Sequence, residues 1–174
     1  VSFAGPAVAP AIFGPVSIDS LGSAGSLTIA GGTLNVAAGG MALDSLAVTG
    51  GTLTNAGATT ATSFTQSGGT FAGTGAMAFV DFAQTAGTTN AGGDFTVTNS
   101  FAQTNPGIIN VGGNASITNT VGPLVMGNLS ATGNLSLTSL AGPISQQAGS
   151  ALVAFGTTSA TATQGGVSAN ITLS

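Results

Sequence analysis

The segment SFAQTNPGIINVGG, from Ser100 to Gly113, repeats a pattern that occurs twice earlier in the chain. The related segments are SFTQSGGTFAGTG at residues 63–75 and DFAQTAGTTNAGG at residues 81–93. A Phe-x-Gln motif recurs in them at intervals of 18 and 19 residues, beginning at Phe64, Phe82 and Phe101. A segment that returns at a nearly fixed interval predicts one turn of a stacked repeat rather than a loop.

Each repeat contains two glycine-rich corners, and a predicted strand follows each corner. A short strand such as TLNV (33–36) follows the first corner, and a longer strand follows the second. In the longer strands the apolar residues are spaced by two and then by three, which indicates one inward face with a bend. The predicted inward residues are Met41, Leu43 and Leu46; Met77, Phe79 and Phe82; and Leu135, Leu137 and Leu140. The polar residues predicted at the bends are Asp44 and Ser45; Asp81; Asn99 and Ser100; Asn119 and Thr120; and Ser139.

The repeat length decides the fold class. Repeats of about 18–20 residues are too short for a βαβ unit of roughly 30 residues, but they fit one rung of a right-handed parallel β-helix. The sequence therefore predicts an all-β protein, a β-solenoid of about seven to eight rungs over residues 26–174. Residues 1–25 contain three prolines and are predicted to be a lead-in segment, a cap or an extended arm. Glycine is costly inside a strand, so we expect most glycines at corners that require positive φ.

The composition excludes two classes of function. The 174 residues include no Lys, Arg or His and four acids, with a net charge of −4. Nucleic-acid binding requires cations that displace counterions from phosphate, so this class of partner is excluded. No uninterrupted apolar run reaches the roughly 18 residues of a membrane span. The sequence has no initiator Met and no basic n-region, so we expect any export signal to lie outside it.

Catalysis is not expected, because the side chains that activate nucleophiles are missing. Ser and Thr are abundant, but the sequence has no His, Lys or Cys to serve as a base or partner. Calcium sites usually take several carboxylates from one loop, and the four acids are scattered. We therefore predict a non-enzymatic protein with no catalytic, cofactor-binding or metal-binding residues. We interpret all four acids as solvated residues, namely Asp19, Asp44, Asp81 and Asp94.

Two stretches are similar to a known family. GGTLNVAAGGMALDSLAVTGGTLTNAG (31–57) and GNLSLTSLAGPISQQAGSALVAFGTTSATAT (133–163) resemble the repeat regions of filamentous-haemagglutinin-like bacterial adhesins, which are secreted by the two-partner route. The resemblance covers roughly residues 26–174. It implies a right-handed β-helix outside the cell or on its surface, acting as a stalk, filament or adhesive surface. The sequence departs from such repeats because it has no Lys or Arg, and this lack of positive charge favours packing against like chains.

These observations lead to one main functional hypothesis and one alternative. We expect a structural bacterial cell-surface or extracellular protein that self-associates into fibres or continues into a longer chain. A receptor on a host cell or other surface is a further candidate partner. The alternative is a ligand-binding β-solenoid that binds ice or carbohydrate. The ice hypothesis is motivated by four Thr-x-Thr pairs, namely Thr52 and Thr54, Thr96 and Thr98, Thr118 and Thr120, and Thr161 and Thr163. These pairs fall in different columns of the repeat, so no single array is evident.

Three further predictions concern particular side chains. The motif predicts that Gln66, Gln84 and Gln103 form a buried amide ladder below stacked Phe side chains; the alternative is that these glutamines point to solvent. The C-terminal sequence VSANITLS (167–174) contains no evident capping element, which favours end-to-end growth. Four Asn-x-Ser/Thr sequons are interpreted as stacked turn residues, with glycosylation as the alternative: Asn114, Asn128, Asn134 and Asn170.

Overall fold

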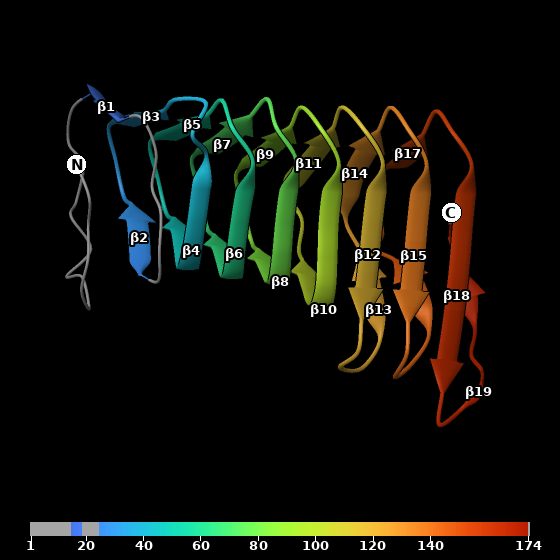
Figure 1. The fold of residues 1–174 in the computed structure, drawn as a ribbon. Coiled ribbons are helices and arrows are strands. Elements are labelled where there is room, and N and C mark those ends of the chain that lie inside the picture. The colour runs from blue at the N-terminus through green and yellow to red at the C-terminus, as the bar shows by residue number, and fades with distance from the viewer. Residues whose placement is uncertain (1–14, 19–24, 174) are drawn as a thin grey trace.

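The computed structural model describes residues 15–18 and 25–173 of the chain. These residues form twenty β-strands and no helix. Successive strands wind into a coil whose axis runs from the N-terminal end at the left of Figure 1 to the C-terminal end at the right. The predicted all-β solenoid is therefore confirmed.

Three sheets form the wall of the coil. Sheet A contains, in spatial order, β1 (Pro15–Ile18), β3 (Thr33–Val36), β5 (Thr52–Asn55), β7 (Thr70–Gly73), β9 (Thr88–Ala91), β11 (Ile108–Val111), β14 (Asn128–Ala131) and β17 (Leu152–Ala154). Sheet B contains β2 (Ser26–Ile29), β4 (Met41–Val48), β6 (Thr59–Gln66), β8 (Met77–Gln84), β10 (Phe95–Gln103), β12 (Ala115–Asn119), β15 (Leu135–Ser139), β18 (Thr158–Gln164) and β19 (Val167–Ser168). Sheet C contains β13 (Leu124–Met126), β16 (Ile144–Gln146) and β20 (Ile171–Thr172).

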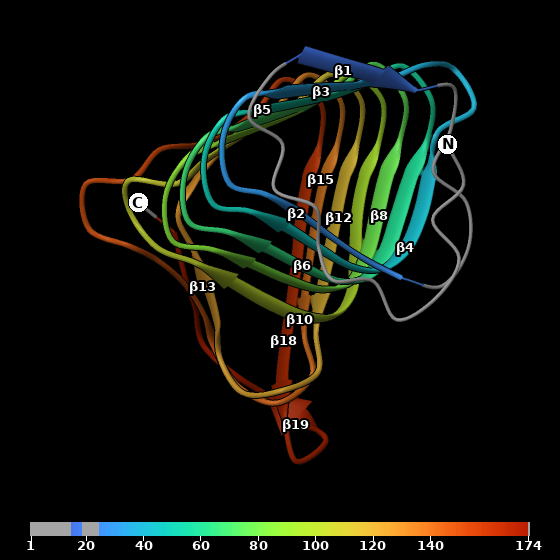
Figure 2. The ribbon, with the colours of Figure 1, turned by 90° about the vertical axis from the view of Figure 1, so that its left-hand side faces the viewer.

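The register of sheet A gives the length of each turn. Aligned residues follow one another at intervals of 19, 18, 18, 20 and 20 residues, namely Thr33, Thr52, Thr70, Thr88, Ile108 and Asn128. The last turn is longer, because Leu129 pairs with Leu152, 23 residues later. Viewed along the axis from the N-terminal end, the chain runs clockwise as it recedes, so the coil is right-handed (Figure 2).

The predicted lead-in segment, residues 1–25, lies mostly outside the described residues. Its described part includes β1, which pairs in parallel with β3, from Pro15 opposite Thr33 to Ile18 opposite Val36. Residues 15–18 therefore form the first strand of sheet A. Asp19 lies outside the described residues.

The interior is filled by columns of side chains from successive turns. The register of sheet B aligns Leu27, Leu46, Phe64, Phe82 and Phe101, and all five are buried. The Phe64 and Phe82 rings stack with centroids 5.0 Å apart, and those of Phe82 and Phe101 are 5.4 Å apart. Sheet A supplies a second column of inward-pointing side chains, which faces the column from sheet B across the interior. Each such side chain stabilises the fold by about 1.5–3 kcal/mol relative to an exposed one.

The bend in the longer strands lies where the spacing of apolar residues predicts it. In β8 Met77, Phe79 and Phe82 are buried, and Asp81 lies beside the bend. In β4 Met41 and Leu46 are buried and Leu43 packs against the core while partly exposed. One extra residue in β10 shifts the register between Val97 and Ser100. The added residue lets the chain change direction while the next apolar side chain still points inward.

From β12 onward the single bent strand is replaced by two separate strands joined by a turn. Two predictions are wrong in this part of the coil. Strands β12 and β15 end at Asn119 and Ser139, which are buried rather than at a bend, whereas Thr120 is exposed where the chain leaves β12. The chain then turns, and the separate strands β13 and β16 follow. Leu140, predicted to point inward, falls on this turn and is 50% exposed. Inside the turn Asn119 Nδ2 donates hydrogen bonds to the carbonyl oxygens of Val121, Gly122 and Pro123.

Glycines occupy the corners as predicted, but positive φ explains only some of them. Nine described glycines have positive φ, so the expectation that most require it is wrong. At most of the other described glycines the reason is close stacking; a Cβ on Gly112, for example, would lie 2.5 Å from the carbonyl oxygen of Gly92 in the preceding turn. Gly51 combines both causes, with a φ of 68° and a Cβ position 2.5 Å from the carbonyl oxygen of Gly32.

The C-terminal end carries a hairpin that the sequence prediction missed. Strand β19 folds back and pairs antiparallel with the end of β18, Thr163 opposite Ser168 and Gln164 opposite Val167. The connecting residues Gly165 and Gly166 both have positive φ, as a two-residue hairpin turn requires. The expectation of an end without any cap is therefore wrong for part of sheet B.

Candidate functional site

The glutamine ladder (Gln66, Gln84 and Gln103) is confirmed as a buried feature of the interior. The three side chains are 2%, 1% and 3% exposed, which rules out the alternative that they point to solvent. Gln84 Nε2 donates to Gln66 Oε1 at 2.9 Å, and Gln103 Nε2 donates to Gln84 Oε1 at 3.1 Å. Thr89, from the facing column of sheet A, also donates to Gln66 Oε1 at 2.7 Å.

Each ladder glutamine also joins two turns at the first corner. Gln84 Nε2 donates to the carbonyl oxygens of Gly87 and Ile108, at 3.3 and 3.0 Å. Gln66 and Gln103 make the equivalent pairs of contacts with their own corners. A Cβ on Gly107 would lie 2.8 Å from Gln84 Oε1, so the next corner lies flat against the amide. The ladder is enclosed, and it supports the fold rather than offering a surface to a ligand.

The three described acids do not gather into one cluster. Asp44 is exposed at the bend of β4. Asp81 accepts a hydrogen bond from Asn99 Nδ2 at 2.7 Å, and Asp94 accepts one from the backbone N–H of Asn114 at 2.7 Å. Within residues 15–18 and 25–173, no three His, Cys, Asp or Glu side chains lie close enough to hold a metal ion. The acids lie on separate parts of the coil.

The outer face of sheet A carries an array of threonines that sequence reasoning missed. The register places Thr33, Thr52, Thr70 and Thr88 in one column, called the threonine column below. Burial alternates along these strands, so Leu34 and its equivalents point inward while the threonines point outward and remain partly exposed. Thr-x-Thr pairs do not reveal this column, because its members lie one turn apart and only Thr52 belongs to such a pair, so the repeat length alone gives the alignment.

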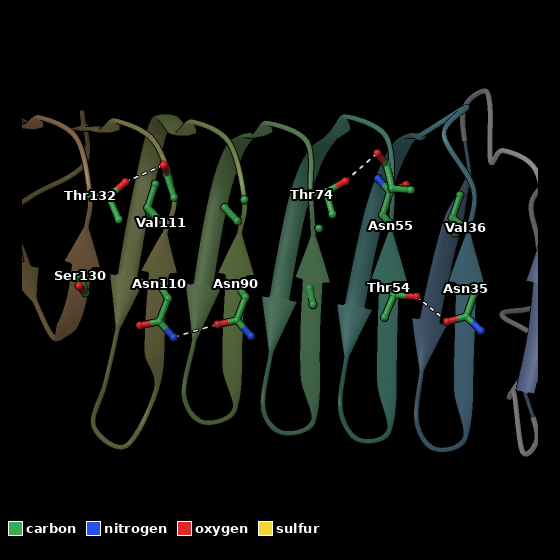
Figure 3. Close-up of a pocket in the computed structure, with 16 residues that line it drawn as sticks. Asn35, Val36, Thr54, Asn55, Thr74, Asn90, Asn110, Val111, Ser130 and Thr132 are labelled. Atoms are coloured by element: carbon green, nitrogen blue, oxygen red, sulfur yellow. Dashed lines mark hydrogen bonds between the residues drawn. The ribbon is translucent and has the colours of Figure 1, made fainter.

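A second outward column lies two residues further along the same strands. It contains Asn35, Thr54, Ala72, Asn90, Asn110 and Ser130. Its members bond to one another, since Thr54 Oγ1 donates to Asn35 Oδ1 and Asn110 Nδ2 donates to Asn90 Oδ1 (Figure 3). Between this column and the second corner lies an open groove of about 630 Å³. Its lining side chains are all uncharged, and none is aromatic.

The second corner carries a ladder of amide side chains that includes two sequons. The backbone N–H of Asn134 donates to Asn114 Oδ1 at 2.9 Å, and that of Thr157 donates to Asn134 Oδ1 at 2.8 Å. The interpretation as stacked turn residues is therefore confirmed for Asn114 and Asn134. Asn128 at the first corner donates to Asn105 Oδ1, and Asn170 is exposed.

The C-terminal end combines unpaired strand edges with exposed apolar side chains. Among the described strands, β17 and β20 are the last of sheets A and C. Strand β18 is covered by β19 only at Thr163 and Gln164. Apolar side chains at this end are 37–77% exposed, namely Val153, Phe155, Val167, Ile171 and Leu173. This end therefore offers main-chain hydrogen-bonding groups beside an apolar surface.

No protein-family model, curated protein or solved structure matches the chain. In the described part of the chain, no helix has the length and apolar character needed to cross a membrane. The fold alone defines the class, and the chain is a β-solenoid repeat protein of about seven turns.

Proposed function

We propose that the chain is a structural, non-enzymatic module of a bacterial cell-surface or extracellular protein of the filamentous-haemagglutinin type. Its coil serves as part of a stalk or filament, and it joins further β-structure through its ends. The partner is a second copy of the chain or a further coil of a longer polypeptide, with a surface receptor as an additional partner.

The single observation that carries this proposal is the C-terminal end. Strand edges with unpaired N–H and C=O groups readily pair with another strand, and natural proteins usually protect them with charge, proline or a covering element. Here β19 covers only the tip of β18, and β17 and β20 have no covering strand among the described residues. No positive charge exists anywhere in the chain, and the net charge of −4 provides little repulsion between copies.

The interior supports a structural role. Every buried side-chain nitrogen and oxygen in the described residues has a hydrogen-bond partner, so no buried polar group is left for a substrate. The sequence also has no His, Lys or Cys to activate its hydroxyl groups. These features favour a rigid rod over an enzyme.

The proposal is tested by measuring assembly. Light scattering and negative-stain electron microscopy should show fibres whose mass increases with protein concentration, while the circular dichroism spectrum remains that of strands. A monodisperse monomer at high micromolar concentration would contradict self-association.

A matched pair of variants locates the contact. Val153 on β17 and Val80 on β8 are 41% and 40% exposed, so replacing either by Lys adds the same charge at the same degree of exposure. Val153→Lys should suppress assembly, because a charged side chain at an edge strand disfavours pairing. Val80→Lys, in the middle of sheet B, should assemble like the unmodified chain. Equal behaviour of the two variants would show that the C-terminal edge is not the contact.

A further inference from the structure

We propose that the outer face of sheet A, from β3 to β9, binds the surface of ice. This inference is independent of the proposed self-association. It rests on the alignment of the threonine column, on the free hydroxyl groups of its members, and on the absence of charge from these strands. Each of these observations constrains the kind of ligand that the face accepts.

The first observation is the regular spacing of the outward side chains. Parallel pairing sets the neighbours in the threonine column about 4.8 Å apart along the axis, and outward residues of one strand about 6.7 Å apart. These two repeats are close to the repeats of oxygen atoms on the prism face of hexagonal ice. The column spans four successive turns, after which its positions are taken by Ile108 and Asn128. The ladder of main-chain hydrogen bonds holds this spacing rigidly.

The second observation is that the hydroxyl groups of the threonine column have no hydrogen-bond partner among the described residues. No hydrogen bond joins them to another residue of the described chain, whereas other outward threonines, such as Thr54 and Thr74, donate within the coil. Each side chain therefore presents one hydroxyl group and one methyl group. The hydroxyl groups can bond to water of a lattice, while the methyl groups restrict the orientation of the water between them.

The third observation disfavours two other occupants of this sheet face, a second copy of the chain and a carbohydrate. A second copy of the chain would bury these hydroxyl groups, and a buried hydroxyl group without a partner costs about 1–3 kcal/mol. A carbohydrate would be expected to stack on aromatic rings, yet the only aromatic residue on β3, β5, β7 and β9 is Phe71, which is fully buried. No charged residue occurs in these four strands, so no ionic hydration shell disturbs the water at the face.

Incorporation into ice tests the proposal. The full chain is dispersed at a concentration where light scattering shows no assemblies, and a slowly growing ice hemisphere is formed in the solution. The chain should be enriched in the ice, whereas a protein that does not bind ice is excluded. Exclusion of the unmodified chain would overturn the proposal.

Two Lys variants in the same turn show whether sheet A is responsible. Thr70→Lys places a charge in the threonine column, and Thr65→Lys places the same charge on the exposed outer face of sheet B. We expect loss of incorporation for Thr70→Lys and unchanged incorporation for Thr65→Lys, each with the circular dichroism spectrum of the unmodified chain. If Thr70→Lys does not fold, Thr52→Lys tests the same column one turn earlier. Retained incorporation of a folded column variant, or equal loss for Thr65→Lys, would overturn the assignment to sheet A.

Discussion

Replacing Gln84, the middle member of the glutamine ladder, by Leu tests whether the ladder stabilises the coil. Gln84 donates to Gln66 Oε1, to Gly87 and to Ile108, and its Oε1 accepts from Gln103 Nε2, so the substitution removes four hydrogen bonds. Gln66 and Gln103 each keep other partners, so neither amide is left without any hydrogen bond. The free energy of unfolding should nevertheless fall.

The magnitude follows from these contacts. Four intramolecular hydrogen bonds contribute a net total of roughly 2–6 kcal/mol, at about 0.5–1.5 kcal/mol each. The more apolar Leu side chain offsets about 1–2 kcal/mol of this loss, at about 0.8 kcal/mol for each additional buried CH₂ equivalent. The branched side chain must also fit below Gly107, which packs directly on the Gln84 amide. The difference is about 0–5 kcal/mol, and its centre corresponds to a net destabilisation of about 2–3 kcal/mol, or a melting temperature lower by about 4–12 °C for a chain of this size.

Urea and thermal unfolding, followed by far-UV circular dichroism, provide the measurement. The matched control is Gln164→Leu, because Gln164 is exposed beside the β18–β19 turn. The control should unfold at nearly the same urea concentration as the unmodified chain. A Gln84→Leu variant with an unchanged midpoint would refute the reasoning that the ladder contributes to stability.

Two further predictions concern the corners of the coil. Gly51→Ala should destabilise the chain by more than about 1 kcal/mol, because positive φ and a clash with Gly32 act together. In the control Gly31→Ala no atom lies within 4 Å of the added Cβ, so its free energy of unfolding in the same urea assay should change by no more than about 0.5 kcal/mol. Asn114→Asp should lower the melting temperature, because it sets a second carboxylate against Asp94, whereas Asp94→Asn should retain stability. Equal melting temperatures for these two variants would contradict the ladder geometry.

The fold and the glutamine ladder could be predicted because the repeat itself encodes them. The Phe-x-Gln motif recurs at the length of one turn, so the alignment of Phe64, Phe82 and Phe101 follows from the interval alone. A spacing of two residues then places the glutamines on the same inward face. Both inferences need only the strand period and the repeat length, and the structure confirms both.

Other features depend on contacts that the repeat does not encode. Leu140 continues the apolar pattern of its strand, but Ser139 takes the inward position and the chain turns after it. The hairpin of β18 and β19 arises from Gly165 and Gly166, in a segment with no counterpart earlier in the chain. The threonine column was missed for a different reason, since its members are separated by whole turns and only Thr52 belongs to a local Thr-x-Thr pair.

The ladders also explain where two of the acids lie in a chain with almost no charge. In ten side-chain pairs that join successive turns of the described residues, the later turn donates and the earlier turn accepts. A carboxylate accepts hydrogen bonds but donates none, whereas an amide does both. Asp81 and Asp94 each occupy the first position of such a ladder, where only an acceptor is required, and amides follow at Asn99 and Asn114. The ladder glutamines also donate to carbonyl oxygens of the following turn, but the ten bonds between side chains share one direction, and they favour head-to-tail over head-to-head stacking of one coil on the next.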